Sequence, residues 1–438
     1  MYKIHYVLRL CIENFHKMLK INDLRAFFSP FLGARLGRIV ARVALPGVVC
    51  AAFCACGGQD SPEGRVKGVS LCSDSVGFSA PGYSSLFRMG SSCGQSLVEI
   101  RSFVGRDTLV KRFVLADSSF AADTANVRRL SAGKEWAGAT VLRVPIHRAV
   151  VLSSAQLGFM ERLGVEDRIV GVGEGKYIVD SSLAARVRAG EVMEVGNGPQ
   201  VSLEKVVSLR PDLVMTFATG GAYDDYDRLA TLAIPLMLTS EWQEDTPLAK
   251  FEWIKLFAKL FGVETFADSI YRQTNEKSVG VSHAEGEASP RVIAGMAYGG
   301  VWYAPGGRSY TASLIRLAGG DYLWAGDTTR EMKFSLEEIM AVADSADVWV
   351  NPGIYGTPED ILAAEPRLER LKPFRTKRIC QNDARKSAGG GNDFYESAVA
   401  YPVELVRNLR ECLFTEITGD SVPKPGPAAY RWYRNIYN

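Results

Sequence analysis

The sequence predicts an α/β protein with two lobes, and three observations support this fold class. Short apolar runs alternate with helical segments from Ala149 to Leu238. The same alternation resumes after Pro290, and a long helical stretch separates the two regions. Because parallel strands need long crossover connections, this alternation is typical of βαβ units. We therefore expect two Rossmann-like α/β lobes bridged by a single long helix, with a small β-rich extension before the first lobe.

The composition is that of a folded globular protein without a basic surface. The chain has 438 residues, of which 47% are hydrophobic and 23% are charged. Its net charge of +2 combines 8 basic and 2 acidic residues in positions 1–55 with 43 basic and 47 acidic residues afterwards. A nucleic-acid-binding protein is expected to carry its basic residues in the folded part. We therefore expect no nucleic-acid partner.

The N-terminus has the layout of a signal peptide, which we assign to residues 1–55. A 14-residue uncharged run, Val43–Cys56, follows a series of arginines and ends at a polar segment. The run is shorter than the roughly 20 residues that span a bilayer. Met18 is an alternative start, because the extension before the arginines is long for a signal peptide. The arginines are Arg25, Arg35, Arg38 and Arg42.

The end of this run, Phe53–Cys56, resembles the lipobox of bacterial lipoproteins, in which a small residue precedes a lipidated cysteine. Cys56 is the candidate lipidation site and Cys54 its rival, since Phe53 stands where an aliphatic residue is usual. The alternative is a cysteine lost with the signal peptide. An exported location permits disulfides, but the sequence leaves the pairing of the later cysteines open. These are Cys72, Cys93, Cys380 and Cys412.

The chain after the signal peptide divides into four predicted parts. A tether and β-rich extension contains apolar runs at Leu109–Leu115 and Thr140–Val144. In the long helical stretch, Thr246 and Pro247 give a helix start signal, and Gly262 marks a kink. The second lobe ends in a helix predicted from Phe394 to Leu413. The predicted parts are the extension (56–145), the N-terminal lobe (146–246), the bridging helix (247–283) and the C-terminal lobe (284–438).

A local repeat relates the two lobes. Ser202–Val207 precedes an apolar strand in the first lobe, and Ser335–Met340 precedes one in the second. In both, serine caps a helix and a glutamate, Glu204 or Glu337, occupies the first turn, where the helix dipole favours negative charge. Glu338 fits the capping-box position. The repeat predicts two related lobes.

Catalytic motifs are lacking. The sequence contains no P-loop, no GxSxG elbow and no HExxH pair. Gly171–Gly175 follows a predicted strand but lacks the last glycine of a dinucleotide fingerprint. His147 and His283 are the only histidines after the signal peptide, so a histidine-rich site for a bare transition metal is not expected. We therefore predict a protein that is not an enzyme, with no intrinsic cofactor or metal.

Aromatic and polar residues gather in segments that follow predicted strands. Ligands of open α/β sheets bind beyond the carboxyl ends of the strands. Aromatic walls suit a bulky ligand, and Arg308 is suited to pair with an anionic group on it. The alternative is that Trp302 and Tyr303 only pack a loop onto a lobe and that Arg308 is solvated. The candidate ligand-binding residues are Trp302, Tyr303, Arg308, Tyr310, Tyr223 and Trp242.

Four segments together resemble a known family: Arg148–Gly173, Val201–Val214, Pro247–Gly262 and Trp302–Gly326. They are similar to the iron-complex and vitamin B12 class of ABC-transporter substrate-binding proteins. Gly390–Leu405 is similar to the branch of this family found in Bacteroidetes lipoproteins. The resemblance implies the helical-backbone substrate-binding protein fold, with a ligand held in the cleft between the lobes.

The resemblance also implies partners. In the family, one glutamate on each lobe pairs with permease arginines, and the matching positions here are Glu204 and Glu337. Relatives that bind bare zinc or manganese use histidine-rich clefts, which this chain lacks. The ligand implied is therefore an iron chelate, haem or a corrinoid, delivered to an ABC permease and its ATPase.

The leading interpretation is a monomeric lipoprotein, anchored to the cell envelope on its periplasmic side, that captures a ferric siderophore or haem. A cobalamin or cobinamide receptor is the alternative within the same fold. An alternative of a different class is a chelatase-like enzyme that acts on a tetrapyrrole, which would rely on a histidine or on Asp224, Asp225 and Asp227. A surface adhesin is the third alternative.

Overall fold

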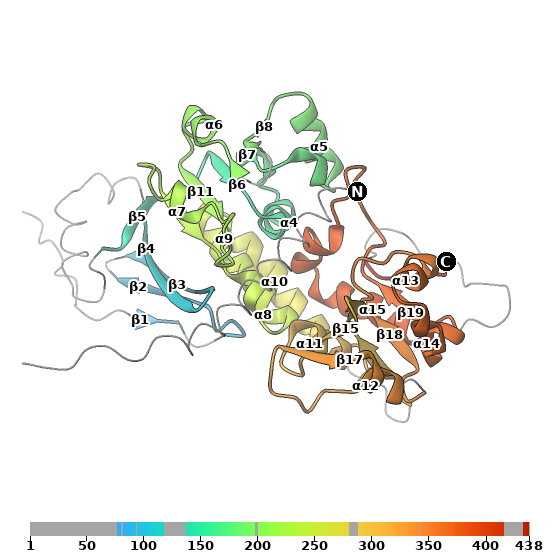
Figure 1. The fold of residues 1–438 in the computed structure, drawn as a ribbon. Coiled ribbons are helices and arrows are strands. Elements are labelled where there is room, and N and C mark those ends of the chain that lie inside the picture. Colours follow the sequence, from blue (N-terminus) through green and yellow to red (C-terminus); the bar gives the residue numbers. More distant parts are fainter. Residues whose placement is uncertain are drawn as a thin grey trace, which may run out of the picture. The chain divides into compact units, whose positions relative to one another are not determined.

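A computed structural model describes most of the chain after position 76 (Figure 1). The described residues all lie in one compact unit, Ser73–Asn438. They are 77–79, 82–92, 94–117, 136, 138–197, 200–279, 288–342, 344–415 and 432–437. The predicted signal peptide, Cys56, Cys72, Cys93 and His283 lie outside them.

The extension before the first lobe forms a five-stranded sheet in the order β1-β2-β3-β4-β5. Its first four strands are antiparallel neighbours, and β5 pairs with β4 in parallel. The predicted β-rich character is confirmed. The long β3–β4 hairpin turns at Gly105, whose φ of 61° favours glycine. The strands are β1 (Gly77–Phe78), β2 (Phe87–Ser92), β3 (Gln95–Val104), β4 (Asp107–Ala116) and β5 (Thr140–Arg143).

The first lobe contains a fully parallel five-stranded sheet in the order β12-β11-β6-β7-β8. Helices connect its successive strands, as the alternating pattern predicts. The strands are β6 (Ala149–Val151), β7 (Ile169–Val172), β8 (Met193–Glu194), β11 (Leu213–Thr216) and β12 (Leu236–Leu238). A small hairpin of β9 (Gly196–Asn197) and β10 (Gln200–Val201) precedes the third helix. The helices are α4 (Ser154–Leu163), α5 (Ser181–Arg188), α6 (Leu203–Ser208) and α7 (Tyr226–Leu229).

The second lobe repeats this plan with the order β16-β13-β18-β19-β20, in which only β20 is antiparallel to its neighbour. A separate three-stranded antiparallel sheet, β14-β15-β17, follows the first strand. The main strands are β13 (Arg291–Ala294), β16 (Asp321–Tyr322), β18 (Val348–Val350), β19 (Ile379–Gln381) and β20 (Arg434–Asn435). The smaller sheet contains β14 (Met296–Tyr298), β15 (Val301–Pro305) and β17 (Glu331–Ser335). The helices are α11 (Tyr310–Leu317), α12 (Leu336–Ala341), α13 (Pro358–Ala364), α14 (Lys372–Arg375) and α15 (Pro402–Phe414).

The last helix is shorter than predicted. It begins at Pro402, where proline at the first helical position costs no hydrogen bond. The preceding residues form two separate 3-10 turns, η6 (Asp393–Tyr395) and η7 (Ala398–Ala400). The prediction of one helix from Phe394 to Leu413 is therefore wrong at its start.

The segment between the lobes is helical but not a single helix. It consists of α8 (Pro247–Glu252), α9 (Ile254–Phe261) and α10 (Glu264–Val279). The predicted start is confirmed, because the Thr246 side chain accepts a hydrogen bond from the Ala249 amide at 3.2 Å. Gly262, with φ of 74°, ends α9 in the left-handed conformation. The two-lobed α/β class is thus confirmed, whereas the uninterrupted helix is not.

A continuous apolar core joins the connecting helices to both lobes. Phe257 of α9 packs against Phe159 of α4, with ring centroids 4.9 Å apart. The same core includes Leu405 and Leu409 of α15. Because densely packed interiors resist displacement, this core fixes the lobes to the connecting segment.

Polar contacts join the lobes directly. The Glu396 carboxylate accepts hydrogen bonds from the amides of Val179 and Asp180, at 2.9 and 2.7 Å. The backbone of Glu396 also lies directly against α4, because a Cβ atom at Gly158 would lie only 2.0 Å from the Glu396 carbonyl oxygen. The Ser387 hydroxyl donates to a carbonyl of the first lobe at 2.6 Å. The chain around Glu396 therefore fits closely against the first lobe.

Several acids crowd this contact. Burial, with further contributions from Asp180 and Asp393, raises the pKa of Glu161 to about 7. Burial is also the main reason that the pKa of Glu396 is raised to about 7, since its amide partners act in the opposite direction. Arg385 lies 3.3 Å from Asp393 and offsets part of the charge.

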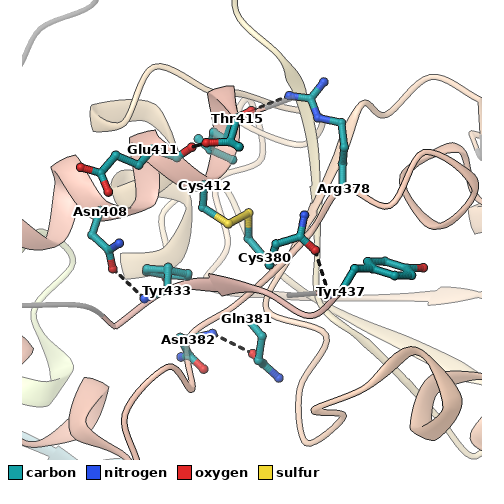
Figure 2. The surroundings of a disulfide bond; sticks show 12 residues. Arg378, Cys380, Gln381, Asn382, Asn408, Glu411, Cys412, Thr415, Tyr433 and Tyr437 are labelled. Carbon is teal, nitrogen blue, oxygen red and sulfur yellow. Dashed lines mark hydrogen bonds between the residues drawn. A yellow bond between two sulfur atoms is a disulfide. The ribbon is translucent and has the colours of Figure 1, made fainter. Parts of the chain in front are cut away.

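A disulfide ties the last helix to the second sheet. Cys380 of β19 bonds to Cys412 of α15, which is 32 residues further along the chain. Figure 2 shows the bond beside Asn408, whose side-chain oxygen accepts the Tyr433 amide at 2.7 Å. Both contacts hold α15 near the edge strand of the sheet. One of the pairings that the sequence leaves open is thereby assigned.

Removing the disulfide should lower stability without changing the fold. For a closed loop of this size, loss of the cross-link is expected to reduce the free energy of unfolding by about 3 to 4 kcal/mol. The double substitution Cys380→Ala/Cys412→Ala should shift the denaturant midpoint accordingly in oxidising buffer. When wild type and variant are both measured in reducing buffer, the difference between their midpoints should shrink to the contribution of the sulfur atoms. Equal midpoints under oxidising conditions would contradict the pairing.

Stability should also fall as pH rises through neutrality. A raised carboxyl pKa means that the folded state binds the proton more tightly than the unfolded chain. The stabilising effect is therefore complete below the ordinary pKa of 4.5 and is lost as the pH passes about 7. We expect Tm to decrease by a few degrees between about pH 6 and pH 8. Glu161→Gln cannot titrate and should flatten this decrease, and an unchanged slope in the variant would count against the assignment.

Candidate functional site

The carboxyl edge of the first sheet carries a pocket at the point where the strand order reverses. From β6 the chain moves to β7 on one side, and later returns to β11 on the other. Open α/β sheets bind ligands at such switch points. A pocket of about 180 Å³ lies here, lined in part by Leu152, Glu174, Phe217 and Tyr223. Tyr223, a predicted ligand-binding residue, is thus placed at a cavity.

Asp224 shapes the loop beside this pocket. Its carboxylate accepts hydrogen bonds from the amides of Thr219 and Gly220, at 2.7 and 2.6 Å. Asp225 accepts the Val201 amide at 3.1 Å, while Asp227 is exposed. The described residues contain no cluster of histidine, cysteine or acidic side chains able to hold a metal ion. The two carboxylates bound to amides therefore hold the backbone in place, which gives the chelatase alternative no support.

Exposed aromatic side chains extend the site beyond the pocket. Phe217, Tyr223 and Trp242 are exposed at the carboxyl edge of the first sheet. In the second lobe Tyr395, in the segment after β19, is 62% exposed. Phe217 and Tyr395 are not among the predicted ligand-binding residues, and Tyr395 falls within the helix predicted from Phe394 to Leu413.

The side chain of Lys250 lies where the connecting segment meets the second lobe. The Lys250 ammonium lies 3.7 Å from the ring centroid of Tyr310. Burial lowers the pKa of Lys250 to about 8, and Glu241 is the largest of the acidic neighbours that oppose this shift. Burial raises the pKa of Glu241, which is completely enclosed. Tyr310, a predicted site residue, thus contacts a desolvated cation rather than open solvent.

Trp302 does not occupy the position expected of a ligand wall. The residue is 0% exposed, and its indole donates to the Ala294 carbonyl at 3.2 Å. Its ring packs against Trp349 at 5.1 Å. The expected loop is strand β15, and alternation along this strand turns Trp302 into the core. The prediction that it binds ligand does not fit this burial.

The other predicted residues of this segment are accessible. Tyr303 is half-buried, with the Lys333 ammonium 5.4 Å from its ring centroid. Arg308 is exposed, and its backbone amide donates to the Thr329 carbonyl at 3.0 Å. Arg308 immediately precedes Ser309, the N-cap of α11, and therefore lies at the carboxyl edge of the second sheet. An anion approaching this edge would meet its guanidinium.

Glu204 and Glu337 are exposed in the first turns of α6 and α12. Backbone and Ser202 hydrogen bonds lower the pKa of Glu204, whereas Glu337 pairs with Arg367 at 3.1 Å. Both helices lead into parallel strands, so their first turns lie at the carboxyl edges of the sheets. The expected capping box of Ser335 and Glu338 is confirmed.

His147 lies away from these edges. It lies two residues before β6, at the amino end of the sheet, and its Nδ1 lies 2.8 Å from the Arg168 guanidinium. It is exposed. Within the described part of the chain, no helix has the length and apolar character needed to cross a membrane.

Known proteins resemble this chain in sequence and in structure. An uncharacterized lipoprotein of Methanocaldococcus jannaschii is 23% identical over 291 residues, which cover 63% of this chain and 67% of the relative. The iron(3+)-hydroxamate-binding protein FhuD of Bacillus subtilis is 28% identical over 138 residues, covering 31% of this chain and 39% of FhuD. The solved structure of a haem-binding protein, HutB of Vibrio cholerae, superposes with a TM-score of 0.48 at 18% identity, covering 61% of this chain and 100% of HutB.

A family model described as periplasmic binding protein matches residues 150–385. The match includes the first sheet, the connecting helices and most of the second lobe. It spans more than half of the chain, and the protein therefore belongs to the periplasmic binding protein family.

Proposed function

We propose that the protein is the substrate-binding component of an ABC importer for an iron complex, a ferric siderophore or haem. The observation that carries the proposal is the set of exposed aromatic side chains at the carboxyl edges of the two lobes. Phe217, Tyr223 and Trp242 belong to the first lobe and Tyr395 to the second. Such surfaces bind bulky ligands by burying apolar area and by stacking on flat groups.

Charge favours an anionic ligand. Arg308 is exposed beside the N-cap of α11, at the carboxyl edge of the second lobe. Cations in such positions pair strongly with carboxylates, hydroxamates and other oxygen anions. Haem propionates and siderophore oxygens both offer this chemistry. The name of the Bacillus subtilis relative, which refers to iron(3+)-hydroxamate, agrees with this class.

The binding proposal predicts that one metal complex quenches the intrinsic tryptophan fluorescence saturably. Purified protein is titrated with haemin, ferrichrome and cyanocobalamin. Trp242→Ala should weaken binding of the active probe about tenfold, because it removes an exposed aromatic contact. Phe266→Ala is the matched control, since Phe266 is an exposed aromatic residue on α10 and should leave the affinity unchanged.

The outcomes of this titration separate the ligands. Saturation by cyanocobalamin alone would replace the iron complex by a corrinoid, the alternative that the same fold serves. A protein that responds to none of the three probes would contradict the proposed function.

We further propose that the loaded protein docks on an ABC permease through Glu204 and Glu337, that the importer's ATPase drives transport, and that Cys56 carries a lipid anchor on the periplasmic side. The support for docking is the repeated placement of one exposed glutamate in the first turn of a helix on each lobe. Exposed carboxylates of this kind are suited to pair with arginines of a partner. We propose that the protein binds its ligand as a monomer and does not change the ligand chemically.

Reversing both charges should abolish uptake while leaving ligand affinity unchanged. The variant Glu204→Arg/Glu337→Arg is compared with Asp167→Arg/Asp344→Arg, whose acids lie in connections to the amino ends of β7 and β18. The side chains of Glu337, Asp167 and Asp344 are 76, 69 and 79% exposed, so the reversals are matched in accessibility. Uptake of the radiolabelled complex into cells is measured beside Kd. Normal uptake by the first variant, or an equal loss in the second, would contradict the docking assignment.

A further inference from the structure

We propose that the β3–β4 hairpin of the N-terminal extension forms a third wall of the ligand site, and that Phe103 at its end contacts the bound complex. The inference rests on the proposed function and adds a specificity-determining element to it.

The hairpin turn is fixed to the loop that borders the pocket. The Gly105 amide donates to the Thr219 carbonyl at 3.2 Å. A Cβ at Gly220 would lie 2.3 Å from the Gly105 nitrogen, so the two backbones approach more closely than any other residue would allow. Asp224 holds this same loop, and Phe217 and Tyr223 on either side of it line the pocket. The turn therefore lies beside the candidate site.

Phe103 itself is held by the segment that carries Trp242. The Phe103 amide donates to the Gln243 side-chain oxygen at 2.9 Å, and the Gln243 amide group donates back to the Phe103 carbonyl. The buried hydroxyls of Ser102 and Ser240 form a second link. Gln243 and Trp242 belong to η4 (Glu241–Gln243), which follows β12. The backbone of Phe103 is thus fixed next to an exposed aromatic residue at the carboxyl edge.

The second lobe reaches the same point. The Arg330 guanidinium lies 5.9 Å from the centroid of the Phe103 ring and pairs with Asp245 at 2.9 Å. Arg330 follows Thr329, whose carbonyl accepts the Arg308 amide. Phe103 therefore lies where the extension, the first lobe and the second lobe meet.

The exposure of Phe103 supports a contact with a ligand. The residue is 40% exposed, although its backbone is held by buried polar partners. A large apolar side chain held rigidly in water gains free energy when another surface covers it. A flat or bulky complex in the cleft would cover this ring and place its anionic groups near Arg308 and Arg330. The contact would favour complexes large enough to reach the hairpin.

The test compares Phe103→Ala with Val110→Ala in the full protein. Val110 lies on β4 of the same hairpin and is also 40% exposed. Titration with haemin, ferrichrome and cyanocobalamin first identifies the probe that wild type binds. Phe103→Ala should then weaken binding of that probe about tenfold. Phe103→Tyr, which keeps the ring, and Val110→Ala should stay within about twofold of wild type.

A second measurement does not depend on the size of the affinity change. Phe103→Trp introduces an indole at the proposed contact, and saturating probe should protect it from quenching by acrylamide. Val110→Trp should gain no such protection. Wild-type binding with unchanged affinity in Phe103→Ala and no protection in Phe103→Trp would overturn the inference and leave the proposed function intact. Failure of wild type to bind any probe would overturn both.

Discussion

The apolar core around α9 is the constraint on which the rest of the structure depends. Phe257 packs on Phe159 of the first lobe, and the same core continues to Leu405 of the second. Burial of apolar area supplies most of the driving force for such packing, and a dense core cannot slide without opening voids. The carboxyl edges of the two sheets are therefore held in fixed relation by residues buried in this core.

Polar contacts act where this core ends. Glu396 binds two amides of the first lobe, and Arg330 pairs with Asp245 at the start of the connecting segment. The pair of Arg330 and Asp245 is accessible to solvent and is therefore weakened by salt, whereas Glu396 is 2% exposed and its hydrogen bonds are shielded from water. An apolar core and a buried polar contact thus join the two lobes, and together they limit relative movement of the lobes.

The sequence was sufficient for the βαβ plan of the two lobes, since the alternation leaves a clear pattern around Ala149–Val151 and Val348–Val350. The sequence was insufficient to predict the structure where one local pattern is compatible with two arrangements. Trp302 was predicted to bind ligand because it lies in a segment that follows a predicted strand, but it pairs in β15 and faces inward. The connecting segment was predicted as one helix with a kink at Gly262, where α9 does end. The further break between Glu252 of α8 and Ile254 of α9 was not predicted, because the apolar residues keep helical spacing across it. Composition identifies aromatic residues, but only the fold decides which of them face solvent.

The N-terminal extension shows the same limit at long range. Ser102 and Ser240 are 138 positions apart, and Gln243 binds a backbone that precedes it by 140. No periodicity or motif signals such a contact, because serine and glutamine are common surface residues. Their burial here is informative, since buried polar side chains persist only when their hydrogen bonds are satisfied. The other end of the sheet combines apolar packing, as between Phe87 and Trp253, with hydrogen bonds from the Ser84 amide and hydroxyl to Glu252 and Glu244. The polar links at the hairpin end fix the direction of one strand where the two lobes meet.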